Sequence, residues 1–273
     1  MSLTSFLDEK EIRSRFKSEF DKPLVSTKVE LLAPPLSQSY GITGTAFDYL
    51  FRFMMKKIYP NTIDRTWVAE NSLNYLKVIG MNEIVPIATK IIQETKICYR
   101  DYLKNSKNIL PTTNLIQLTV KLAYLDTLAR CGQIDVHAMR HTKSAIVKDL
   151  EQLLGIVDIQ AFKPASVCIL NPTFGKGSNL VGGADADLLI DDCLIDIKVT
   201  KHHSFERDTF NQVVGYYCLS LIGGIDDCRK NHKIKRLGIY FARHASLFSF
   251  QVTQLDIRRE FLEWIKKRAV SFN

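Results

Sequence analysis

The sequence predicts an α/β (α+β) fold in which a large helical portion precedes a mixed sheet. Apolar residues recur at helical spacing through most of residues 44–155, whereas short apolar runs of β type dominate from about residue 165. The chain has 273 residues, 46% of them hydrophobic and 24% charged, which is enough to bury a sizeable core. We therefore expect a mainly helical portion over 1–155 and a sheet-containing core over 156–273, packed as one unit.

The helical portion is predicted from apolar stripes and from the residues that end them. A stripe beginning at Phe47 predicts a helix over 44–59, and Pro60 ends it. Further helices are expected over 64–80, 82–104, 111–131 and 136–154. Gly132 follows the third of these as a stop signal.

The second portion is predicted to alternate short strands with helices. The expected order is a strand at 166–171, a hairpin at 186–199, a helix at 205–221, two strands within 234–252 and a helix at 255–269. Gly175 and Gly177 form a lone G-x-G with no helix expected after it, so we do not interpret it as a phosphate-binding loop.

The hairpin carries the most informative residues of the chain. If Asp191 and Asp192 form its turn, Ile190 faces Cys193 and the pairing continues outward. Cross-strand partners share a face of the sheet, and so do residues two apart on one strand. One face then carries Asp185, Asp187, Asp196 and Lys198, while Ile195, Ile197 and Val199 point into a core.

Three acids and a lysine on one face favour a metal site. Like charges opposite each other destabilise a sheet, and Mg²⁺ would relieve the repulsion because it prefers oxygen ligands. Asp187 and Asp196 would be the ligands, with the main-chain carbonyl of Ile197 as a third oxygen. Lys198 would hold an attacking water or a negatively charged transition state. The alternative is a solvated face on which Asp185 or Asp187 pairs with Lys198.

The helix after the hairpin adds two polar residues to this picture. Gln212 and Tyr216 are four residues apart and share a helix face, where they can contact a metal-bound water or a phosphate. The alternative places Tyr216 in the core and Gln212 on the surface. A basic run follows, as a phosphate contact or as a solvated loop. Its members are Arg229, Lys230, Lys233, Lys235 and Arg236.

The order helix, strand, hairpin with D…D-x-K, helix with Q-x-x-x-Y and strand resembles the PD-(D/E)XK nuclease superfamily, in its RecB-like branch. The residues that carry the likeness are Asp187, Asp196 to Lys198, and Gln212 with Tyr216. The likeness covers about residues 165–242. It implies a restriction-endonuclease-like core with a mixed sheet flanked by helices, and metal-dependent hydrolysis of phosphodiester bonds.

Two upstream acids compete to complete the site that the resemblance implies. Asp48, in the helix over 44–59, stands where RecB-like nucleases often carry a histidine, and it can instead pair with Arg52 four residues on. Glu151 is the competitor, because other members of the superfamily use an upstream helical glutamate. The C-terminal cysteine grouping of an iron–sulfur cluster is absent, so no cluster is expected.

The sequence therefore predicts a nuclease with Mg²⁺ as its metal and Mn²⁺ as a substitute. A net charge of +8 favours nucleic acid as the partner, with DNA ahead of RNA. A ribonuclease and a non-catalytic nucleic-acid-binding module that kept the fold are the alternatives. A protein partner supplying a motor or specificity is compatible with the sequence, which leaves the oligomeric state open.

The remaining sequence features favour an intracellular protein with free thiols and no further metal site. The six cysteines are scattered without any C-x-x-C pair, so we expect free thiols. His137 and His141 share a helix face without a metal-binding glutamate, and we interpret them as an exposed or satisfied pair. No apolar run is long enough to span a membrane, and residues 1–17 lack the apolar core of a signal peptide. A cytoplasmic location follows as an expectation.

Overall fold

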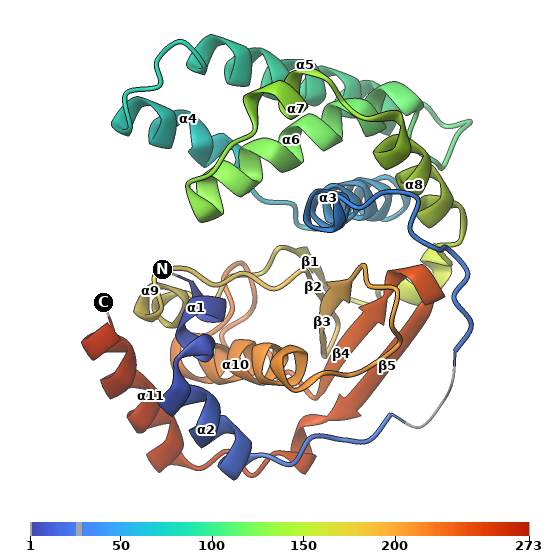
Figure 1. Ribbon diagram of the computed structural model, residues 1–273. Helices are drawn as coiled ribbons and strands as arrows, with labels where there is room; N and C mark the ends of the chain where they lie inside the picture. Colours follow the sequence, from blue (N-terminus) through green and yellow to red (C-terminus); the bar gives the residue numbers. More distant parts are fainter. Residues whose placement is uncertain (1, 26–28, 273) are drawn as a thin grey trace.

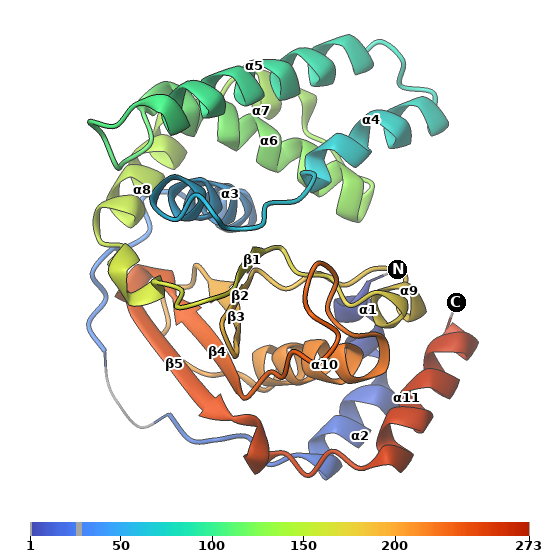
Figure 2. The same cartoon turned by 180° about the vertical axis from the view of Figure 1, so that it is seen from behind.

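The computed structural model describes residues 2–25 and 29–272. A layer of helices lies above a five-stranded mixed sheet, and further helices cover the opposite face of that sheet (Figure 1). The rear view shows the same arrangement, with α3 on the side of the helical layer that faces the sheet (Figure 2). The predicted α+β class, a mixed sheet flanked by helices, is confirmed.

The upper layer, residues 40–155, is here called the helical portion. It consists of α3 (Tyr40–Ile58), α4 (Val68–Val78), α5 (Val85–Lys104), α6 (Thr113–Cys131), α7 (Val136–Arg140) and α8 (Ser144–Gly155). The first of these, α3, is buried on most sides because it lies between the other helices and the sheet. Gly132 ends α6 in the left-handed conformation, with φ of 69°, as predicted.

The sheet has its strands in sequence order. They are β1 (Cys168–Leu170), β2 (Leu188–Ile190), β3 (Cys193–Lys198), β4 (Arg236–Phe241) and β5 (Ser246–Gln251). Neighbouring strands are antiparallel except β3 and β4, which are parallel and joined by α10 (Arg207–Gly223). The carboxyl ends of β3 and β4 therefore meet at one edge of the sheet.

Two hydrophobic cores lie on the two faces of the sheet. Alternate residues of β2 and β3 belong to different cores: Leu188 and Ile195 pack against the helical portion, whereas Leu189 and Leu194 pack against α10 and its neighbours. Ile197 and Val199 contact the first core as well. The predicted division of the hairpin into an apolar face and a face bearing Asp196 and Lys198 is thus confirmed.

The amino-terminal helices α1 (Leu3–Asp8) and α2 (Lys10–Glu19) pack with the carboxy-terminal elements. The main-chain NH of Leu3 donates to the carbonyl of Gly183, and the ring of Phe16 lies 5.3 Å from that of Phe261 on α11 (Arg259–Phe272). Residues 2–20 and the elements from β1 onward thus form one unit, here called the sheet portion.

Two local predictions were wrong. The helix expected over 136–154 is broken between α7 and α8, where His141 caps the first and Lys143 precedes the second. The G-x-G segment is followed by a short helix, α9 (Lys176–Leu180), although no helix was expected there. Gly175 has φ of 51° and Gly177 lies against the carbonyl of Leu219, so the two glycines allow this turn to pack tightly on α10.

Three one-turn 3₁₀ helices complete the described chain. They are η1 (Ile159–Phe162), η2 (Ala242–His244) and η3 (Val252–Gln254). Within residues 2–25 and 29–272, none of the helices has the length and apolar character needed to cross a bilayer.

Candidate functional site

The turn of the β2–β3 hairpin forms as predicted, with Ile190 opposite Cys193. Asp191 adopts φ of 51°, and its carboxylate accepts hydrogen bonds from the main-chain NH groups of Ala165, Ser166 and Val167 at 2.7–3.0 Å. These bonds favour the charged form, so the pKa of Asp191 falls to about 2 even though partial burial opposes the shift. The turn therefore fixes the hairpin to the segment before β1 and sets its register.

A continuous chain of polar contacts runs from β3 to α10. The Lys198 Nζ atom lies 2.8 Å from Asp196 Oδ2 and donates to Gln212 Oε1 at 2.8 Å. Gln212 Nε2 in turn donates to the Tyr216 hydroxyl at 2.8 Å. The helical spacing of Gln212 and Tyr216 and the position of Lys198 at the end of β3 bring these four predicted residues together.

The charge states along this chain follow from burial and neighbouring charge. Burial lowers the pKa of Lys198, but Asp196, and to a smaller extent Asp187, more than offset this, and the net pKa is raised. Burial, followed by the charges of Asp196 and Asp187, raises the pKa of Tyr216 well above its ordinary value. Lys198 is thus a cation and Tyr216 a neutral phenol at neutral pH.

Asp187 lies beside this chain, immediately before β2. Its Oδ2 atom accepts a hydrogen bond from the main-chain NH of Ile197 at 2.5 Å, which ties it to β3 next to Asp196. Burial raises the pKa of Asp187 well above its ordinary value, and the charges of Asp48 and then Asp196 raise it further. Three acids therefore act on one another at this edge of the sheet.

Asp48 is the upstream acid whose charge reaches the site. It lies in the third turn of α3, not at the helix start, and Arg52 donates to its Oδ2 atom at 2.7 Å, as the four-residue spacing predicts. Burial raises the pKa of Asp48 although Arg52 opposes the shift. Glu151 is exposed on α8, where it accepts a hydrogen bond from the Thr113 hydroxyl at 2.9 Å. The structure thus brings Asp48, and not Glu151, toward Asp187.

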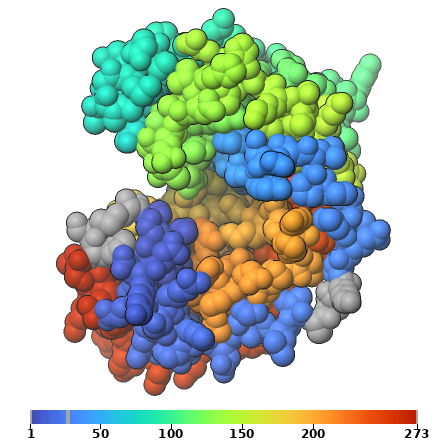
Figure 3. Space-filling view, in the orientation of Figure 1, coloured from blue at the N-terminus to red at the C-terminus, as the bar shows by residue number. Residues whose placement is uncertain are grey.

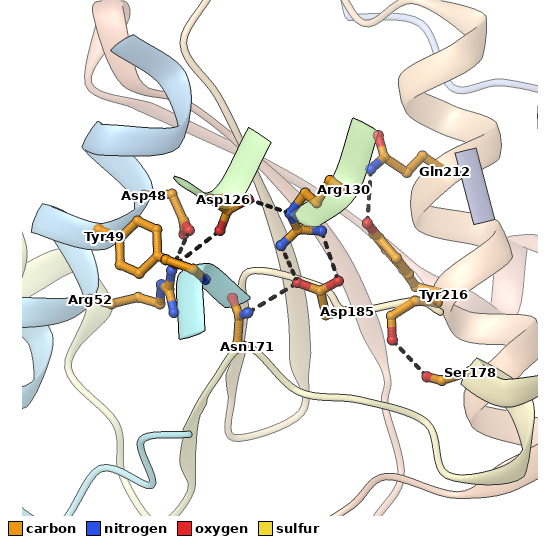
Figure 4. A network of polar contacts seen from close by, with 12 residues as sticks. Asp48, Tyr49, Arg52, Asp126, Arg130, Asn171, Ser178, Asp185, Gln212 and Tyr216 are labelled. Atoms are coloured by element: carbon orange, nitrogen blue, oxygen red, sulfur yellow. Dashed lines mark hydrogen bonds and ion pairs between the residues drawn. The ribbon is translucent and has the colours of Figure 1, made fainter. Parts of the chain in front are cut away.

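The predicted position of Asp185 opposite Lys198 was wrong. The β2–β3 pairing ends at Leu188, and Asp185 instead forms a bridge with Thr173. Its carboxylate makes two hydrogen bonds with the Arg130 guanidinium, at 3.1 and 2.8 Å, and accepts one from Asn171 at 3.0 Å (Figure 4). The segment from Asp185 to the start of β2 diverges from β3, so the carboxylate of Asp185 faces the end of α6.

Arg130 links the helical portion to the segment before the hairpin, and no sequence motif singled it out. Its Nε atom donates to Asp126 Oδ1 at 2.6 Å, and Tyr49 donates to the other oxygen of Asp126 at 2.9 Å. Figure 4 shows Arg130 between Asp126 and Asp185, with Tyr49 on the far side of Asp126. Asp126 and Arg130, four residues apart on α6, were the available signal, but the partner that Arg130 reaches, Asp185, is 55 residues away in the sequence.

The donor set fits a divalent cation held by two carboxylates. Asp48 Oδ1 is buried without a hydrogen-bond partner, whereas Asp196 Oδ2 is engaged by the Lys198 ammonium at 2.8 Å. Across the described ranges, no three side chains among His, Cys, Asp and Glu converge to form a complete metal cage. Mg²⁺ does not need one, since it commonly uses one or two carboxylates and keeps several waters.

The molecule is hollowed between the helical portion and the sheet portion. Figure 3 shows this hollow below α6, with a floor in the yellow and orange that mark the hairpin region and α10. A pocket of about 800 Å³ next to the Arg130 contact is lined in part by Asp185, Asn171 and Arg65. The carboxylate of Asp185, two residues before Asp187 in the chain, therefore lines a concave surface large enough to admit a ligand.

The other predicted polar residues lie outside this cluster. His137 and His141 are exposed, with ring centroids 4.8 Å apart, as expected for a pair without a metal. All six cysteines are free thiols, as predicted, and burial raises the pKa of Cys193 to about 11. No family model, curated protein or solved structure matches the chain.

Proposed function

We propose that this protein is a metal-dependent nuclease of the PD-(D/E)XK type, in its RecB-like branch, that hydrolyses phosphodiester bonds of DNA. The observation that carries the proposal is the polar chain from Asp196 through Lys198 and Gln212 to Tyr216, beside the carboxylate of Asp187. The order of three antiparallel strands, a helix and a parallel fourth strand agrees with the core that this resemblance implies.

Asp187 and Asp196 would hold Mg²⁺, and the negative charge of Asp48 on α3 would act on the site without being a third ligand. A bound Mg²⁺ would neutralise these carboxylates, polarise the scissile phosphate and lower the pKa of a bound water. The buried Asp48 Oδ1 atom, which has no hydrogen-bond partner, supports this assignment. After burial, the charges of Asp48 and Asp196 raise the pKa of Asp187 further, and a bound cation would offset this repulsion.

Lys198 acts as a fixed positive charge at the reacting phosphate. Its raised pKa keeps it protonated, so it orients the attacking water and offsets negative charge without removing a proton itself. Gln212 holds the lysine by accepting its hydrogen bond, and Tyr216 holds Gln212 in turn. Gln212 and Tyr216 are thus positioning residues unless a substrate phosphate reaches them.

A nuclease time course tests the proposal. Linear DNA, closed-circular DNA and RNA of equal length are incubated with Mg²⁺, Mn²⁺ or EDTA and with wild type, Lys198→Ala or Lys201→Ala. Lys201 is the matched control because it is exposed, three residues further along the chain. We expect metal-dependent cleavage of DNA, slowed about 10²-fold or more by Lys198→Ala and unchanged by Lys201→Ala.

The outcomes separate the alternatives. Faster cleavage of RNA than of DNA would make the protein a ribonuclease. Binding without cleavage in any metal would indicate a nucleic-acid-binding module that kept the fold. Full activity of Lys198→Ala would refute the assigned site.

A further inference from the structure

A second concave surface lies beyond the carboxyl end of α10, away from the site described above. It is a groove of about 750 Å³ between that end of the helix and the loop that leads to β4. Arg229, Lys230 and Lys233 line it together with His232, whose Nε2 atom has no hydrogen-bond partner. We call these three cations with His232 the basic groove.

The structure divides the basic run of the sequence into two sets. Lys235 and Arg236 lie 3.9 and 2.9 Å from the carboxylate of Asp192, which neutralises part of their charge. Arg229, Lys230 and Lys233 are exposed, and none of them forms an ion pair with another described residue. Three positive charges therefore remain without a protein counter-charge in one concave surface.

The acids nearest in sequence are engaged elsewhere. Asp226 accepts hydrogen bonds from the Thr173 hydroxyl and the Gly175 NH, and Asp227 pairs with Arg65. The dipole of α10 favours cations at its carboxyl end, but that effect falls off within the last turn, and the three cations lie in the loop beyond it. Local charge balance therefore does not explain the basic groove.

The basic groove and the proposed catalytic residues are attached to the same helix. With a rise of about 1.5 Å per residue, residue 223 lies roughly 16 Å along the axis of α10 from residue 212. This distance corresponds to about five steps of a nucleic-acid strand at ~3.4 Å each. A strand that runs from Lys198 to the groove must therefore follow α10 back over at least this length.

We infer that the basic groove binds backbone phosphates of the nucleic-acid strand whose scissile bond lies at Lys198. The inference rests on the proposed function. Phosphate contacts of this kind position a strand without reading its sequence, so the groove would increase affinity for any sequence. It would add about three phosphate contacts to those made at the site itself.

The test measures binding without cleavage. Binding is followed by fluorescence anisotropy with DNA of about 20 nucleotides, as a single strand and as a duplex, which is long enough to span both sites. The salt concentration is varied from low to moderate in the presence of EDTA. The variant is the triple change Arg229→Gln, Lys230→Gln and Lys233→Gln. Its matched control is Lys10→Gln, Lys17→Gln and Lys163→Gln, which removes three other exposed cations. Thermal unfolding of both variants checks that they fold.

We expect the slope of log K against log salt to become shallower by about 2 for a single strand and about 3 for a duplex in the groove variant. The control variant should change the slope by less than about 1. Equal slopes in the two variants, or no binding by wild type, would overturn the inference.

The result is also distinguishable from failure of the proposed function. If wild type cleaves DNA while the two slopes stay equal, the nuclease assignment survives and the groove assignment fails. If wild type cleaves no DNA but the slope of log K against log salt becomes shallower in the groove variant only, the groove binds phosphates and the nuclease assignment fails.

Discussion

Asp48→Asn is the substitution that tests the acid cluster most directly. The charge of Asp48 ranks after burial, and ahead of Asp196, among the causes that raise the pKa of Asp187. One oxygen of Asp48 is engaged by Arg52 and the other has no donor. Asparagine keeps the shape and an acceptor for Arg52 but removes the charge, so the affinity of the site for Mg²⁺ should fall.

The expected size follows from binding linkage. Loss of an acid that supports a metal site commonly lowers metal affinity by about 10–100-fold. At a Mg²⁺ concentration of about 100 times the wild-type Kd, the metal stabilises wild type by about 2.7 kcal/mol. A Kd raised about 30-fold reduces that increment to about 0.9 kcal/mol, again by linkage. At about 2–4 °C per kcal/mol, the metal-induced rise in Tm should shrink by roughly 4–7 °C.

The assay is thermal unfolding with and without Mg²⁺, and the readout is the metal-induced increment rather than Tm itself. The metal-free Tm of Asp48→Asn combines relief of acid repulsion with a weaker partner for Arg52, so its direction is not diagnostic. Glu151→Gln is the control, because Glu151 is exposed and bonded to Thr113. Equal increments in wild type and Asp48→Asn, or a reduced increment in Glu151→Gln, would contradict the placement of Asp48 at the site.

Two further predictions concern stability. Arg243 and Asp149 form a fully buried ion pair with two bonds of 2.8 and 2.9 Å, so Arg243→Met should cost about 3–5 kcal/mol in urea unfolding. Lys266→Met, in the surface pair with Glu263, should change the urea midpoint little by comparison. The pKa of Asp191 is about 2 in the fold against an ordinary 3.8, so its carboxylate contributes stability that is complete above about pH 4 and is lost as the pH falls toward 2. Asp191→Asn should therefore unfold at lower urea than wild type at pH 7, and the two proteins should converge near pH 2; a gap that stays constant with pH would contradict this.

The sequence could predict the hairpin and α10 because their signals are local. The turn at Asp191 fixes a register, and alternation along β3 then places Asp196 and Lys198 on one face. Helical spacing alone puts Gln212 four residues before Tyr216 on the same side of α10. Each of these inferences needs only the geometry of one strand or one helix.

What the sequence could not predict depends on contacts between distant elements. Asp185 was placed by extending the hairpin, but the partner that draws it away is Arg130 on α6. The pairing of Arg243 with Asp149 joins η2 to α8, and neither residue belongs to a motif. The choice between Asp48 and Glu151 likewise required the position of α3 over the sheet, which no local pattern specifies.

The packing of α1 and α2 against α11 has a consequence for how the chain folds during synthesis. Phe20 contacts Phe261 with ring centroids 4.9 Å apart, so α2 needs a partner that is synthesised much later in the chain. At about 5–20 residues per second, the 240 residues between Phe20 and Phe261 take roughly 12–48 s to appear. The helical portion can fold in that interval, whereas the apolar side of α2 remains exposed because α11 has not yet been synthesised. A nascent chain of this protein should therefore expose the apolar side of α2 to chaperones until α11 has been synthesised.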